Sequence, residues 1–223
     1  MLLALPFRAG GTVAGPIGLL GTTLHEIGHA VVALVTGLHV DGMVVRSNGS
    51  GTTYISGHSI GDTAEVAISS AGYVGMLTCA ALFLLVGRWP RASRTVFFVA
   101  GAVLALSGLL WMDGVFAFCA AAVLGAGCVV VGALVSDRWI GVTATVLGSV
   151  LAFSGLSDVA GVERGNVDAE HAAHATGLGL SGVRNLWLLI GFGLVVAAFV
   201  VRAVIGRRRR PPAALERADD GTV

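Results

Sequence analysis

The sequence predicts an all-α polytopic membrane protein with about six transmembrane helices and a small β-hairpin after the first helix. Hydrophobic residues make up 55% of the 223-residue chain, charged residues make up only 12%, and the mean hydropathy is +0.86. Soluble domains carry about 25% charged residues, so this composition excludes an ordinary soluble domain. The apolar residues also gather in stretches of the length that crosses a bilayer.

Six apolar stretches are long enough for membrane spans, because a helix needs about 20 apolar residues to cross the hydrocarbon core. We expect these spans at about 12–37, 64–87, 95–112, 114–135, 139–159 and 185–205. Only the Trp-Met-Asp-Gly sequence at 111–114 separates the third span from the fourth, so the turn between them must be tight. We predict that the six spans and their connections, residues 1–206, form a single transmembrane domain.

The segment that follows the first span has a different character. Residues 38–57 place β-prone residues on either side of Ser-Asn-Gly-Ser-Gly, a pattern typical of a β-hairpin. The longest polar connection, 157–182, is predicted to emerge on the same side of the membrane.

Arginines mark the opposite side. If the spans alternate in direction, eleven of the fourteen arginines fall on the side where the chain starts and three on the other. Cytoplasmic loops have such an excess. We therefore expect a multi-pass protein, in the plasma membrane, with both termini in the cytoplasm and a disordered cytoplasmic tail at 207–223. The lipid bilayer is the expected partner of the arginine-rich segments. Nothing indicates a nucleic-acid partner, and the sequence does not fix an oligomeric state.

One group of ionisable residues lies inside the first span. His25-Glu26-Ile27-Gly28-His29 is a His-Glu-x-x-His motif, and residues four apart share one face of a helix, so both imidazoles can bind one zinc ion. Glu26 lies beside them and can accept a proton from a water molecule that zinc activates. Ionisable residues at membrane depth are costly and indicate function. A zinc site of this kind needs a third protein ligand.

These features resemble the site-2-protease (M50) family of intramembrane zinc metalloproteases, and most closely its M50B-like branch. The resemblance rests on HEIGHAVVALVTG in the first span, GSGTTYISG in the hairpin and SSAGYVGM in the second span, with FSGLSDV, NVDAEHAAHATGL and Trp187 near the end. It implies hydrolysis of peptide bonds by a zinc ion held by two histidines and a distal aspartate. In this family a glutamate acts as the base, which here is Glu26.

Three aspartates could complete the site. We favour Asp158, at the end of the fifth span, which matches a tyrosine-aspartate position associated with the M50B-like branch. Asp168 matches a later Ser-Asp-Ala element, with Val167 in place of the serine, and is expected as a helix N-cap. Asp113 superficially resembles a Leu-Asp-Gly element but lies in the tight turn. His171 and His174 are interpreted as a solvated pair and not as ligands.

The sequence thus predicts an intramembrane zinc metalloprotease that acts on membrane-embedded or membrane-proximal proteins or peptides. An exposed strand of the hairpin, 40–56, would pair with an unwound substrate. The alternative is a non-proteolytic membrane scaffold or transporter-like protein that retains the zinc site. A zinc peptidase of the CAAX-processing Ste24 type is disfavoured, because that family usually takes a glutamate as its third ligand.

Overall fold

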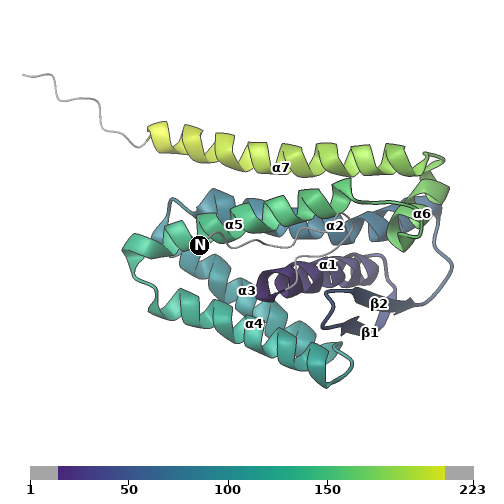
Figure 1. The fold of residues 1–223 in the computed structure, drawn as a ribbon, viewed down its shortest axis with the longest axis horizontal. Coiled ribbons are helices and arrows are strands. Elements are labelled where there is room, and N and C mark those ends of the chain that lie inside the picture. Colours follow the sequence, from purple (N-terminus) through teal and green to yellow (C-terminus); the bar gives the residue numbers. More distant parts are fainter. Residues whose placement is uncertain (1–14, 209–223) are drawn as a thin grey trace, which may run out of the picture.

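The computed structural model describes residues 15–208. Figure 1 shows their helices and the single hairpin in chain order. The elements are α1 (Pro16–Val35), β1 (His39–Val45), β2 (Gly51–Ser56), α2 (Asp62–Val86), α3 (Pro90–Leu110), α4 (Val115–Leu134), α5 (Asp137–Ala160), α6 (Val167–Thr176) and α7 (Leu180–Arg208). All but α6 among these helices are long and apolar enough to cross a membrane, which confirms the predicted fold class of six spans and one hairpin.

The element bounds differ from the sequence-based prediction at several places. Helices α3 and α7 each begin five residues earlier than predicted. The polar connection at 157–182 contains a helix, α6, which Asn166 caps by accepting a hydrogen bond from the Ala169 amide. The last helix continues to Arg208, so the first two residues of the predicted tail are helical. The rest of that tail, and the part of the first predicted span before Gly15, lie outside the described residues.

Helix α2 lies at the centre of the molecule. It packs against α1, α5 and α7, and α3 and α4 form a separate antiparallel pair (Figure 1). Leu77 and Leu84 of α2 are fully buried between these neighbours. In contrast, α7 is buried along little of its length, as expected for a helix whose outer face contacts lipid.

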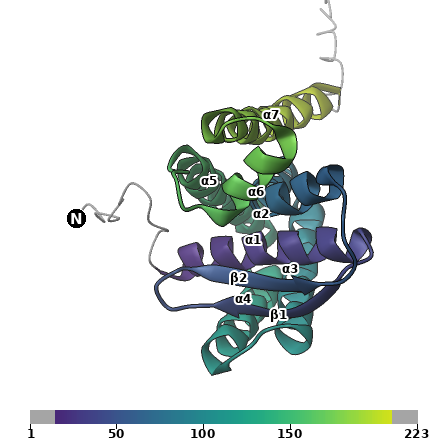
Figure 2. The ribbon, with the colours of Figure 1, turned by 90° about the vertical axis from the view of Figure 1, so that its right-hand side faces the viewer.

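The hairpin and α6 lie at the same end of the molecule, next to α1 (Figure 2). The two strands pair in antiparallel fashion, with Met43 opposite Thr53. The α3–α4 turn adds to the outer edge of β1: the Met43 amide donates to Trp111 O over 2.6 Å, and the Asp113 amide donates to Met43 O over 2.7 Å. Within residues 15–208 no strand pairs with the outer edge of β2.

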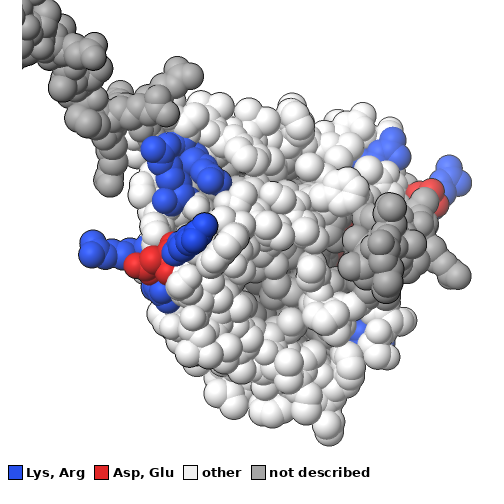
Figure 3. All heavy atoms as spheres, turned by 60° about the vertical axis from the view of Figure 1, so that its left-hand side comes forward, with Lys and Arg blue, Asp and Glu red and all other residues white. Residues whose placement is uncertain are grey.

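Arginines gather at the other end of the molecule, where α2 turns into α3 and α4 turns into α5 (Figure 3). Arg88, Arg91 and Arg138 are exposed there. The protein is an integral multi-pass membrane protein, and the cytoplasmic location of this end remains a prediction.

Candidate metal centre

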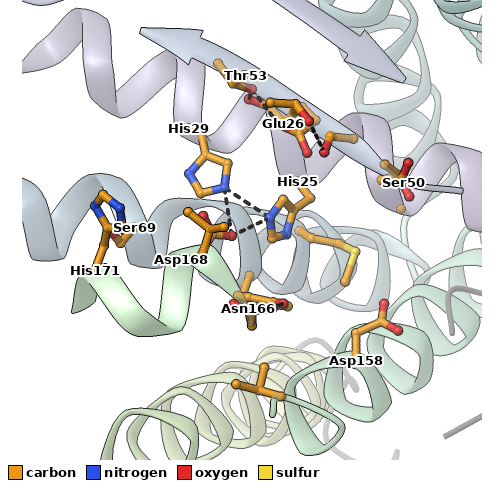
Figure 4. A pocket seen from close by; sticks show the side chains of 18 of the residues that line it. His25, Glu26, His29, Ser50, Thr53, Ser69, Asp158, Asn166, Asp168 and His171 are labelled. Carbon is orange, nitrogen blue, oxygen red and sulfur yellow. Dashed lines mark hydrogen bonds and ion pairs between the residues drawn. The ribbon is translucent and has the colours of Figure 1, made fainter. Parts of the chain in front are cut away.

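Three side chains from two distant segments meet at one point. His25 Nε2 lies 3.0 Å from His29 Nε2 and 3.1 Å from Asp168 Oδ2, and His29 Nε2 lies 3.3 Å from the same oxygen. Figure 4 shows the two rings and the carboxylate facing one another. Among the described residues these three form the single group of histidine, cysteine or acidic side chains arranged to hold a metal ion.

The spacing of the three atoms fits a zinc ion. Zinc bonds of about 2.0–2.1 Å in tetrahedral geometry separate the ligand atoms by about 3.3 Å, close to the three distances found here. The donor set of two imidazole nitrogens and one carboxylate oxygen also suits zinc, and three protein ligands leave a fourth position open, as in catalytic sites. The residues present therefore fit the ion that the motif implies.

The main chain of α2 fixes the orientation of His29. Its Nδ1 lies 2.7 Å from Ile68 O, and because a carbonyl can only accept, Nδ1 must be the protonated nitrogen. The lone pair is then left on Nε2, the atom that faces His25 and Asp168. Only 6% of His29 is exposed, so the ring is also held by packing.

Two glycines allow α1 and α2 to approach closely enough for this geometry. A Cβ on Gly28, inside the motif, would overlap the main chain of α2 at Ala71. A Cβ on Gly72 would overlap the ring of His25, which therefore packs directly against the main chain of α2 at that point. The same ring stacks edge-on against Tyr73, with 4.6 Å between the ring centroids. His25 is therefore confined by α2 on one side and by an aromatic ring on the other.

Helix α6 brings Asp168 to the histidines. The expected N-cap role of Asp168 is wrong: Asn166 is the cap and Asp168 is the second residue of the helix. Asn166 also donates from Nδ2 to Tyr73 Oη over 2.8 Å, which ties the start of α6 to α2. Burial alone would raise the pKa of Asp168, but the two imidazole rings beside its carboxylate outweigh it and hold that pKa below its ordinary value.

Glu26 follows His25 on α1 and projects beside the two histidines, towards the hairpin. Only 5% of it is exposed, and its Oε2 accepts a hydrogen bond of 2.6 Å from Thr53 Oγ1. Gly51 makes room for it, since a Cβ there would overlap the Glu26 carboxylate. The predicted base thus lies between the histidine pair and β2 (Figure 4).

The structure brings Asp168 to the histidines, and not the favoured Asp158. The chain turns back after α5 ends, so α6 packs against α2 and carries Asp168 to the histidines of α1, whereas Asp158 stays on α5 and lines another part of the cavity (Figure 4). Asp113 lies against β1, where a Cβ on Gly42 would overlap its carboxylate. His171 Nδ1 lies 3.1 Å from Glu65 Oε1, and His171 is not part of the candidate metal group found among the described residues.

The cluster opens into a cavity of about 690 Å³. Its walls come from α1, β2, α2, the end of α5 and the start of α6, and they include Glu26, Thr53, Tyr73 and Asp158. This volume lies within the range of about 300–1,000 Å³ that is usual for ligand sites. The three ligand atoms therefore line a cavity of the size that ligand sites usually have.

Comparison with known families decides the identity of the fold. The family model described as peptidase M50B-like matches residues 1–203, nearly the whole chain. The chain belongs to the peptidase M50B-like family. This confirms the resemblance inferred from the sequence and supports a peptidase-like function in general. Neither the curated proteins nor the solved structures gave a match to this M50B-like chain.

Sequence reasoning missed three residues that shape the site of this M50B-like protein. Thr53 binds Glu26, and Tyr73 and Asn166 connect α2 to α6. Each lies inside or beside a segment that resembles the family, in GTTYIS, SAGYVG and NVDAEH. The signal was therefore present, but only the fold shows which partner each side chain meets.

Proposed function

We propose that this protein is an intramembrane zinc metalloprotease in which His25, His29 and Asp168 hold the ion and Glu26 acts as the general base. One observation supports this most strongly. Two imidazole nitrogens and a carboxylate oxygen converge at tetrahedral spacing beside a buried glutamate, on the wall of a cavity of about 690 Å³. A glutamate beside a zinc site with an open fourth position is the arrangement in which the glutamate serves as general base of a metalloprotease.

Zinc bound at this point would polarise the substrate carbonyl and lower the pKa of water. The remaining work belongs to the side chains of the protein. Glu26 accepts the proton of the attacking water at its carboxylate and returns it to the nitrogen of the leaving amine. Asp168 and the hydrogen bond from His29 to Ile68 O keep the ligand atoms aimed at one point.

The substrate is proposed to be an extended segment of a membrane protein, because a helix hides its carbonyl groups in hydrogen bonds. The outer edge of β2 is open among the described residues and lines the cavity. An unwound segment can pair with this edge, as in other peptide complexes formed by strand addition. Its scissile bond would then lie between β2 and the three ligand atoms.

The test compares three purified proteins: wild type, Glu26→Gln, and Glu163→Gln as a matched control at an exposed position in the α5–α6 connection. The probe is a library of peptides from a proteome digest, incubated with each protein in detergent, with new termini identified by mass spectrometry. Each preparation is also assayed for bound zinc.

We expect wild type and Glu163→Gln to cut the same peptides, and Glu26→Gln to retain zinc but lose cleavage by at least 100-fold. Cleavage that survives Glu26→Gln contradicts the proposal. Full zinc occupancy with no cleavage in any variant would favour the alternative, a zinc-binding membrane scaffold or transporter-like protein.

A further inference from the structure

Thr53 is the single described residue whose side chain hydrogen-bonds the predicted base. Its Oγ1 lies 2.6 Å from Glu26 Oε2 and 3.2 Å from Glu26 O. A hydroxyl has one proton, and the shorter distance to a charged acceptor marks the carboxylate as its main partner. Thr53 hydrogen-bonds none of the three proposed ligands, so its effect on the site passes through Glu26.

The main chain of the same residue faces the open edge of β2. Opposite Thr53 in the hairpin is Met43, whose amide and carbonyl bond outwards to Trp111 and Asp113. Met43 and Thr53 are therefore a non-hydrogen-bonded pair, and in such a pair both residues point their amide and carbonyl away from the partner strand. The N–H and C=O of Thr53 are thus directed to the edge that an added strand would use.

The side chain of threonine links these two features rigidly. Its branched Cβ restricts rotation about χ1, so the direction of the hydroxyl follows the main chain of β2. A peptide that pairs with the N–H and C=O of Thr53 is consequently placed in a fixed position relative to the Glu26 carboxylate. Gly51, two residues earlier, leaves the space that the carboxylate occupies in this position.

We propose that Thr53 is the positioning residue that sets the general base against the substrate strand. The proposal rests on the proposed function and adds one element to it: the substrate pairs with β2 at Thr53, and the Thr53 hydroxyl orients Glu26 towards the bond opposite. Pairing and base orientation are then coupled through one residue, and binding in a shifted register would leave the scissile bond out of reach of Glu26.

The first test uses metal-free protein and no catalysis. A hydrogen bond to a charged acceptor that is lost in a protein of this size should lower the melting temperature by about 3–6 °C in Thr53→Val. In a Glu26→Ala background, where the carboxylate is absent, the same substitution should cost less than half of that shift. Equal shifts in the two backgrounds would overturn the contact on which the proposal depends.

The second test measures cleavage of one peptide taken from the library, by zinc-loaded wild type, Thr53→Val and Thr53→Ser. The matched control is Thr52→Val, which removes a hydroxyl from the adjacent residue, where it bonds Gly51 O instead of Glu26. We expect Thr53→Val to lower kcat roughly 10- to 100-fold with KM and zinc content near wild type, because the main-chain edge is intact. Thr53→Ser should recover most of kcat.

Three results would contradict the positioning role: kcat within twofold of wild type in Thr53→Val, a serine variant as slow as the valine variant, or an equal loss in Thr52→Val. These results are distinct from failure of the proposed function, which would appear as cleavage by Glu26→Gln. A protein that loses cleavage in Glu26→Gln but not in Thr53→Val uses the base without this support.

Discussion

The choice between Asp168 and Asp158 as the third ligand gives the sharpest test of the proposed centre. Asp168 Oδ2 lies 3.1 and 3.3 Å from the two imidazole nitrogens, whereas Asp158 lines the same cavity outside that group. We predict that Asp168→Asn loses zinc and that Asp158→Asn keeps it. Both substitutions remove one negative charge and change the side-chain volume very little, so each serves as the control for the other.

The expected size of the effect follows from the number of ligands. Four-ligand zinc sites bind with about 10–16 kcal/mol, or roughly 3 kcal/mol per ligand, and 1.4 kcal/mol is a factor of ten in affinity. Loss of the Asp168 carboxylate should therefore weaken zinc binding by roughly 100- to 1,000-fold. Asp158 can contribute only a screened charge attraction, so its substitution should cost about tenfold or less.

Competition with a fluorescent zinc chelator in detergent measures these affinities, and elemental analysis gives the stoichiometry of zinc bound per chain. The melting temperature of each metal-free variant shows whether it is folded. Zinc retained by Asp168→Asn and lost from Asp158→Asn would refute the assignment. Equal losses in both variants would refute it as well, since they would place both carboxylates in contact with the ion.

Two further predictions concern the surroundings of the ligands. Gly72→Ala should lower zinc affinity by at least tenfold, because a Cβ at Gly72 overlaps the ring of His25. Gly75→Ala, one turn away on α2, should lower the affinity much less, because its Cβ does not overlap that ring. The chelator competition measures both affinities, and equal effects would argue against steric control of the His25 ring. His171→Ala should leave one zinc per chain and change zinc affinity by less than about threefold, because the His171 side chain is 58% exposed and pairs with Glu65, outside the group of ligand atoms. A loss of zinc by elemental analysis would make His171 part of the centre.

Local sequence patterns were sufficient for much of the fold and for the histidine pair and glutamate of the site. Apolar stretches of about 20 residues gave the six membrane helices, and the turn residues at 47–51 gave the hairpin. The spacing of His25 and His29 placed both rings on one face of α1 because helical periodicity acts over four residues. These features depend only on neighbours in the chain.

The third ligand and the partner of Glu26 could not be predicted in this way. Asp168 is 143 residues from His25, and whether it or Asp158 reaches the histidines depends on how the chain turns after α5 and on the link between Asn166 and Tyr73. Thr53 meets Glu26 only because the hairpin folds back over α1. The sequence by itself determined the helices, the hairpin and the pair of histidines. Only the tertiary structure decided which carboxylate joins them, because the turn after α5 and the hydrogen bond from Asn166 to Tyr73 carry Asp168, and not Asp158, to the histidines.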